Sequence, residues 1–195
     1  PGFYNVINAL AALAAADALG VAPEEAALAL GKYAGTKRRF ERKGVYAGVE
    51  IIDDYAHHPT EVRATLSAAR NCPHKRIWCV FQPHTYTRTA SLLDEFARAL
   101  CLADRVIVTD IYAAREVDDG RVHARDLVRR LEELGGEALY LPSFEAVAAH
   151  LAANARPGDL ILTMGAGDIG RIGEMLLARE PSPRSDRGEG PCSMG

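Results

Sequence analysis

The ionisable residues that could do chemistry are concentrated in the segment from Ile51 to Glu61. Two apolar residues lead into paired aspartates, an aromatic residue, two adjacent histidines and a proline that can open a helix. Open α/β sheets bind ligands beyond the carboxyl ends of their strands, so this segment favours a binding site. Asp54 could accept hydrogen bonds from sugar hydroxyls, and His57 could hold an anionic or amine-bearing ligand. The alternative is a helix start that Asp54 orders and that His57 or His58 caps.

A second polar cluster, from Phe81 to Thr89, follows one strand–helix unit later and has the same layout. It contains His84 and Arg88 among several hydroxyl side chains. An arginine makes a bidentate fork for a carboxylate or a phosphate. The simpler alternative is that Arg88 pairs with Asp94 or Glu95 on the next helix turn. Two polar loops at the ends of successive strands predict one shared site.

Two further pairs could reach a nucleotide. Arg38 and Arg39 lie in a basic turn between two structural regimes, where an arginine could reach a bound phosphate, although a basic pair is usually a solvated face. Asn5 and Asn8 lie three residues apart among alanines, and asparagine is a poor helix former. They could read the edge of a nucleobase, or Asn5 could be a helix cap with Asn8 there by chance.

The glycine-rich string from Gly165 to Gly170 matches G-x-G-x-x-G between an apolar run and a helical pattern. We interpret it as a tight turn with close helix packing, because no later strand could supply a ribose-binding acid. The sequence contains no G-x-x-x-x-G-K-[ST] phosphate loop and no acidic cluster clearly poised for magnesium. A nucleotide-driven reaction could not be completed by this chain alone.

Composition narrows the class of protein. The 195 residues are 48% hydrophobic and carry a net charge of −3, which predicts a globular fold and gives no reason to expect nucleic acid or an anionic membrane as partner. No apolar run is long enough to span a bilayer, and the Ala-rich opening is no signal peptide. The four cysteines fit no zinc or CxxC spacing, which favours a reduced, cytoplasmic protein.

The helices and strands that must position these residues are predicted from the periodicity of apolar residues and from the residues that break each pattern. Two helices are predicted first, and a basic turn then breaks the helical pattern. A strand pair around Gly48 follows, and then helices and strands alternate. Such alternation predicts an α/β fold, a Rossmann-like, mainly parallel sheet with helices on both faces. The predicted helices are residues 5–19, 23–32, 59–70, 90–102, 124–134, 144–153 and 169–178, and the predicted strands are 45–49, 49–53, 76–81, 106–109, 139–141 and 160–164.

The composition of the two ends of the chain supports two further predictions. Residues 180–195 are rich in Pro, Ser, Arg and Gly, so we predict a disordered tail. The chain opens on Pro1 without a methionine, and its first helix has an Ala face that needs a partner. We therefore expect a fragment of a longer protein.

Taken together, these strings resemble the Mur ligases, the ATP-dependent enzymes that build the peptide stem of peptidoglycan. The matches stay in order from residue 2 to about residue 178. The resemblance implies a division into the end of a central ATP-binding domain (1–35), a Rossmann-like domain that delivers the amino acid (36–179) and a tail (180–195). The strings that carry it are Asn5–Ala12, Arg38–Glu41, Asp53–Glu61, Phe81–Thr89, Asp110–Glu116 and Thr163–Asp168.

The resemblance implies an amide ligation. ATP, with Mg²⁺, would convert the lactyl carboxylate of UDP-N-acetylmuramate into an acyl phosphate that the amine of L-alanine attacks. Phe81–Thr89 favours L-alanine as the amine substrate. A family alternative attaches a recovered tripeptide to the same sugar nucleotide, but tends to have an acidic-Pro-Arg segment at Gln82–His84. A non-catalytic nucleotide-binding module is the alternative outside the enzyme class.

The resemblance also implies roles for residues. Asn5 and Asn8 would lie near the adenine, while Arg39 would face the phosphates or ribose and Asp54 the ribose. The amino acid would be surrounded by Tyr55, His57, His84 and Arg88, with Arg88 on its carboxylate. The rest of the same enzyme would supply the phosphate loop by domain closure. Two positions depart from the family pattern: Tyr4 stands where members often have His, and Thr85 where some have Arg.

Overall fold

A computed structural model of the chain describes residues 3–33 and 35–179. Among the described residues, an opening helical pair is followed by two consecutive strands and then by helices alternating with strands, as the sequence predicts, except that two helices stand where the sequence predicted one. The helices are α1 (Phe3–Ala18), α2 (Pro23–Gly31), α3 (Pro59–Arg70), α4 (Tyr86–Ser91), α5 (Leu93–Leu100), α6 (Ala124–Glu133), α7 (Phe144–Asn154) and α8 (Arg171–Leu177). The strands are β1 (Glu41–Tyr46), β2 (Val49–Asp54), β3 (Ile77–Phe81), β4 (Arg105–Val108), β5 (Ala138–Tyr140) and β6 (Leu160–Met164).

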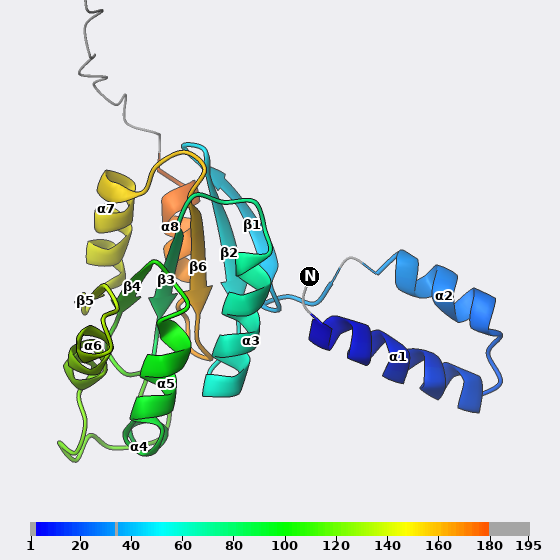
Figure 1. Cartoon of the computed structure of the whole chain (residues 1–195), viewed down its shortest axis with the longest axis horizontal. Coiled ribbons are helices and arrows are strands. Elements are labelled where there is room, and N and C mark those ends of the chain that lie inside the picture. The colour runs from blue at the N-terminus through cyan, green and yellow to red at the C-terminus, as the bar shows by residue number, and fades with distance from the viewer. Residues whose placement is uncertain (1–2, 34, 180–195) are drawn as a thin grey trace, which may run out of the picture.

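The six strands form one sheet in the order β1-β2-β6-β3-β4-β5. β1 runs antiparallel to β2, and every other neighbouring pair is parallel. The carboxyl ends of β2, β6, β3 and β4 therefore lie along a common edge (Figure 1). Because side chains beyond parallel strands meet at this edge, the topology brings together the two polar loops that the sequence places after β2 and β3.

Helices cover both faces of the sheet, and each face has its own apolar core. In Figure 1, α3 and α5 lie in front of the sheet and α8 lies behind it. The front core packs Val62, Leu66 and Phe96 against the strands, while the rear core packs Leu151 and Leu176. All five side chains are inaccessible or nearly so. The predicted α/β class, with a mainly parallel sheet between helices, is confirmed.

The helix that follows β2 has strong start signals. His58 Nδ1 accepts a hydrogen bond from Thr60 N, and Glu61 accepts one from His58 N. Pro59 occupies the first turn, where its missing amide hydrogen costs nothing. This reciprocal cap fixes the direction in which the chain leaves β2. The cap that the sequence offered as the alternative for His58 is therefore present.

The helical pair α1–α2 packs on itself and lies beside the α/β body in Figure 1, joined to β1 through residues 35–40. It exposes several large apolar side chains, among them Val6, Leu10 and Leu28. This exposed apolar face agrees with the expectation that the first helix needs a partner. None of the described helices is long and apolar enough to cross a membrane.

The secondary structure predicted from the sequence differs most from the observed structure around the second polar loop. The predicted helix over residues 90–102 is wrong in form: helix begins at Tyr86, and a break at Leu92 separates α4 from α5. The four hydroxyl or aromatic residues at 85–87 and 89 resemble a loop by composition, so the pattern concealed a helical turn inside the site. The predicted first strand also begins earlier, at Glu41. The predicted disordered tail lies outside the described residues.

Candidate functional site

Four rings form a continuous row along the carboxyl edge of the sheet. Tyr55 lies edge-on to His57 with ring centroids 5.2 Å apart, and His57 lies edge-on to His84 at 5.9 Å. His84 in turn stacks on Tyr112 at 5.5 Å. The rings come from the ends of β2, β3 and β4, so the prediction that the two polar loops converge is confirmed. Together they form one partly exposed surface, which we call the ring row.

Guanidinium groups flank this row. The Arg38 and Arg39 guanidinium carbons lie 4.9 Å and 5.7 Å from the Tyr55 centroid. Toward the other end, Arg88 Nη1 lies 3.4 Å from Nδ1 of His84. Arg38 uses Nε and Nη2 on Asp53 and Gly165 O, whereas the guanidinium of Arg39 makes no hydrogen bond among the described residues. The row therefore offers separated cationic ends that suit a ligand, or two ligands, with separated anionic groups.

Asp94 and Glu95 are not the partners of Arg88 that the simpler alternative proposed. Asp94 pairs with Arg130, with 2.6 Å between Asp94 Oδ1 and Arg130 Nε, and its second oxygen lies 3.9 Å from Arg98. Among the described residues, no carboxylate lies within ion-pair distance of Arg88. Its fork is thus turned toward His84 and the ring row.

The loop that carries His84 is held by backbone bonds and by one carboxylate. Thr85 N donates to Tyr112 O at 2.8 Å, and Tyr112 N donates to Pro83 O at 2.8 Å. Glu116 accepts from Thr87 N at 2.9 Å and from the Thr87 hydroxyl. Thr85 itself has φ +68°, a conformation that is strained for a β-branched residue. Such strain is tolerated where the surroundings fix the backbone.

Burial lowers the pKa of His84, and the positive charge of Arg88, with that of His57 when its ring is protonated, acts in the same direction. Glu116 opposes the shift. His84 is therefore held in its neutral form at neutral pH. A neutral imidazole has one donor and one acceptor nitrogen, so the identity of its neighbours fixes which nitrogen faces a ligand.

Asp54 is the predicted ribose ligand, and its carboxylate already has partners. Its oxygens accept hydrogen bonds from Phe40 N and Ala56 N, both at 2.8 Å, and the side chain is only 3% exposed. Burial raises the pKa of Asp54, against the lowering effect of the two amides. This is the turn-ordering role offered as the alternative, and contact with a ribose stays a prediction.

Asp53 and Arg38 tie three segments together behind the row. Arg38 Nε donates to Asp53 Oδ2 at 3.2 Å, and Arg38 Nη2 donates to Gly165 O at 2.6 Å. The other Asp53 oxygen accepts from the Thr163 hydroxyl at 2.7 Å. Asp53 is 2% exposed, so this network is internal to the fold. Arg39, in contrast, is exposed, and its side chain contacts the ring of Tyr55.

The structure does not add Asn5 and Asn8 to the ring row. Both lie on α1 and are exposed. Their predicted contact with adenine therefore stays a prediction, as does contact between Arg39 and the phosphates.

The glycine-rich string has the packing role that we predicted. A Cβ atom at Gly170 would lie 3.0 Å from the Asp53 carboxylate, and one at Gly165 would lie 2.8 Å from Gln82 O. Gly165 also has φ +152°. The string thus turns sharply after β6 and lets α8 approach β2. Beneath it lies Gln82 Oε1, a buried oxygen without a hydrogen-bond partner among the described residues.

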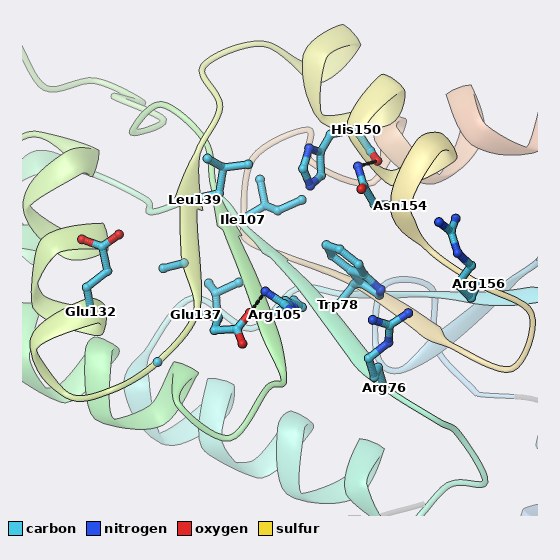
Figure 2. A pocket seen from close by; sticks show the side chains of 13 residues that line it. Arg76, Trp78, Arg105, Ile107, Glu132, Glu137, Leu139, His150, Asn154 and Arg156 are labelled. Atoms are coloured by element: carbon cyan, nitrogen blue, oxygen red, sulfur yellow. Dashed lines mark hydrogen bonds and ion pairs between the residues drawn. The ribbon is translucent and has the colours of Figure 1, made fainter.

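A separate cavity of about 630 Å³ lies at the opposite, amino edge of the strands, beside α7 (Figure 2). Trp78 forms part of its floor, and its Nε1 donates to Asp159 Oδ2 at 3.0 Å. Arg76 pairs with the same carboxylate at 3.1 Å, and Arg105 pairs with Glu137. Because two of its three arginines are already neutralised by carboxylates, this cavity lacks a clear preference for an anion. None of the predicted site residues lines it.

Among the described residues, no three His, Cys, Asp or Glu side chains gather as a metal-binding group. Sequence reasoning also missed three contributors to the site: Tyr112, Glu116 and the structural role of Arg38. The only signal for the first two was their place in the segment after β4, Asp110–Glu116. Their contacts depend on long-range geometry that a single sequence does not report.

Comparison with known proteins gives a consistent result. Residues 38–167 match the family model described as Mur ligase, glutamate ligase domain. The chain is 54% identical over 177 residues to UDP-N-acetylmuramate–L-alanine ligase of Acetivibrio thermocellus, covering 91% of this chain and 38% of that protein. The chain therefore spans well under half the length of this relative.

Solved structures agree. The crystal structure of the UDP-N-acetylmuramate-alanine ligase from Thermotoga maritima matches with a TM-score of 0.76 and 32% identity, covering 91% of this chain and 37% of that one. A murein peptide ligase from Psychrobacter arcticus matches with a TM-score of 0.66 and 30% identity, covering 90% and 36%. Both likenesses cover more of the chain than the α/β body alone contains.

Proposed function

The chain belongs to the Mur ligase family, and from this premise we propose that it is part of an ATP-dependent ligase that joins L-alanine to UDP-N-acetylmuramate in peptidoglycan synthesis. The ring row with Arg88 at its end is the observation that supports this best. An α-amino acid carries a carboxylate and an amine on one carbon. A guanidinium fork beside two imidazoles offers partners for both groups.

The chemistry requires an activated carboxylate. ATP supplies the phosphoryl group that turns the lactyl carboxylate of the sugar nucleotide into an acyl phosphate, and Mg²⁺ would neutralise phosphate charge when bound. We assign the magnesium ligands to the rest of the enzyme, because the described residues offer no grouped acidic set for it. This chain's part is to hold the amino acid and to present its amine to the acyl carbon.

Within this proposal, Arg88 binds the carboxylate of L-alanine, while Tyr55, His57 and His84 surround the rest of the molecule. Arg39 extends toward the nucleotide from the Tyr55 end of the row. Asn5 and Asn8 on α1 contact the adenine, and Asp54 shapes the turn nearest the ribose. Residues 1–35 form the end of an ATP-binding domain, and residues 36–179 form the amino-acid-delivering domain. The partners are thus the two substrates and the remaining domains of the same enzyme.

A second candidate is the attachment of a recovered tripeptide to the same sugar nucleotide. The likeness to the murein peptide ligase favours it. ADP release by the longer enzyme distinguishes the two, measured with UDP-N-acetylmuramate and either L-alanine or the stem tripeptide. Release with L-alanine is the expected result, and release only with the tripeptide would replace the proposal by the second candidate.

A further inference from the structure

The hydrogen bonds of His57 fix where its proton lies. Its Nδ1 is 3.0 Å from the carbonyl oxygen of Tyr55 and 3.3 Å from Glu61 Oε2. Both neighbours can only accept a hydrogen bond, since Glu61 is also receiving the His57 and His58 amides as a carboxylate. Nδ1 must therefore carry the hydrogen, and in the neutral ring Nε2 is left as an acceptor.

His84 has the opposite arrangement. Its Nδ1 faces Arg88 Nη1 at 3.4 Å, and a guanidinium can only donate. Nδ1 must therefore accept, so the hydrogen of the neutral ring lies on Nε2. The lowered pKa of His84, which burial and Arg88 cause, keeps the ring in this neutral form. Neighbouring rings 5.9 Å apart thus hold opposite tautomers.

We propose that this pair of tautomers recognises the amino acid and activates it: His57 Nε2 takes a proton from the ammonium group, and the Nε2–H of His84 donates to a substrate oxygen. The inference rests on the proposed ligase function and deepens it by assigning an atom to each task. His57 is then the general base of the ligation, and Glu61 is a positioning residue that orients its ring.

The attack of the amine on the acyl phosphate balances in protons and electrons without another reagent. The ammonium group gives one proton to His57 Nε2, and the freed nitrogen lone pair forms a bond to the acyl carbon. The bond between that carbon and the phosphate oxygen breaks, and phosphate leaves with the electron pair. The second proton on the new amide nitrogen passes to the departing phosphate. Glu61, beside Nδ1, stabilises the positive charge that the ring of His57 acquires.

Other bases at this edge are already engaged. Glu61 receives the amides of His57 and His58, Glu116 receives Thr87, and Asp54 receives two amides at 2.8 Å. Among the hydrogen bonds of the described residues, the ring of His57 is engaged through Nδ1 alone. Its Nε2 is the acceptor that stays available in the ring next to His84.

The tautomers can be measured directly on this chain by nitrogen-15 NMR of the histidine rings at neutral pH. Loss of signals in His57→Asn and His84→Gln assigns each ring. The expected result is a protonated Nδ1 for His57 and a protonated Nε2 for His84. The same tautomer in both rings, or rapid averaging between tautomers in either, would overturn the inference. This result does not depend on whether the longer enzyme ligates alanine.

Matched substitutions then test the roles in the longer enzyme by single-turnover kinetics. His57→Asn keeps a donor near the Nδ1 position for Tyr55 O but removes the acceptor at Nε2. It should slow the chemical step by about 10²-fold or more, with a much smaller effect on alanine binding. His84→Gln keeps a donor near Nε2 and should bind alanine at least about tenfold better than His84→Asn, which lacks it.

The outcomes separate the two proposals. An unchanged chemical step in His57→Asn would remove the base while leaving the ligase function intact. A wild-type enzyme that does not ligate alanine at all would contradict the proposed function, whatever the NMR tautomers are. Equal alanine affinity in the two His84 variants would remove the donor role of His84.

Discussion

At the scale of single residues, the site depends on fixed hydrogen-bond direction more than on charge. His57 and His84 are adjacent in space because β2 and β3 flank β6 and end at one edge. Their rings are oriented by a backbone carbonyl in one case and by a guanidinium in the other. A substitution that keeps the charge but changes the geometry should therefore still impair function.

Arg88 provides the first test of this view. Arg88→Ala in the longer enzyme should reduce kcat/KM for L-alanine by a factor equivalent to roughly 2–5 kcal/mol, because a carboxylate loses its charged partner. The KM for ATP should change far less. Arg88→Lys keeps the charge but loses the planar fork, so its kcat/KM for L-alanine should lie between those of the parent enzyme and Arg88→Ala. An unchanged alanine KM in Arg88→Ala would remove this residue from the amino-acid site.

The lowered pKa of His84 should make the folded chain less stable at acidic pH. Its pKa is lower in the folded chain than its ordinary value, so the unfolded chain binds the proton more readily. The contribution is present above an ordinary histidine pKa of about 6.5 and is lost as the pH falls toward the folded value. Urea unfolding at about pH 7.5 and about pH 5.5 should show a smaller acid loss in His84→Gln than in the parent. An equal loss of stability in both proteins would contradict the lowered pKa of His84 in the folded chain.

At the scale of elements, much of the site was predictable and some of it was not. The polar segments after β2 and β3 stand out because an apolar run ends in ionisable residues, which is why His57, His84 and Arg88 could be predicted. Tyr112 and Glu116 could not, because their roles arise from contacts between the loops after β3 and β4. The start of α4 was missed since Thr85 begins it with a positive φ that no propensity favours.

Arg38 and Arg39 offer a matched comparison of neighbouring cations. Arg38→Ala leaves the buried Asp53 without its ion pair, so it should lower the free energy of unfolding by about 1–3 kcal/mol, reduced by the partial exposure of Arg38. Arg39→Ala removes a contact with the Tyr55 ring and an attraction to Asp54 that involves no direct ion pair, and it should cost less than about 1 kcal/mol. Urea denaturation measures both free energies of unfolding, and equal losses would contradict the structural role of Arg38 in holding Asp53.

The turn after β6 should be intolerant of a side chain. Gly165→Ala places a methyl group 2.8 Å from Gln82 O in a backbone conformation that favours glycine. We expect a loss of about 1–3 kcal/mol. Gly31→Ala, where nothing lies within 4 Å of the added atom, is the control and should leave the unfolding of the α/β body unchanged. Fluorescence of Trp78, the single tryptophan, reports unfolding of that body.

At the scale of the whole molecule, the helical pair and the α/β body have separate tasks in the proposed enzyme. The body presents a preformed row of rings, and the helical pair, which lies to one side of the body in Figure 1, carries exposed apolar and amide side chains. We expect the isolated chain to fold without hydrolysing ATP, because its sequence has no phosphate loop. Steady ADP production by the purified chain would contradict that division of tasks.

The most direct measurement uses a chimera in which this chain replaces the matching part of the Acetivibrio thermocellus ligase, to which it is 54% identical. Formation of the amide product from UDP-N-acetylmuramate is followed by mass spectrometry with L-alanine and with the stem tripeptide. We predict product with L-alanine and its strong reduction by Arg88→Ala. A folded chimera that uses only the tripeptide, or that forms no product with either amine, would contradict the claim that this chain delivers L-alanine.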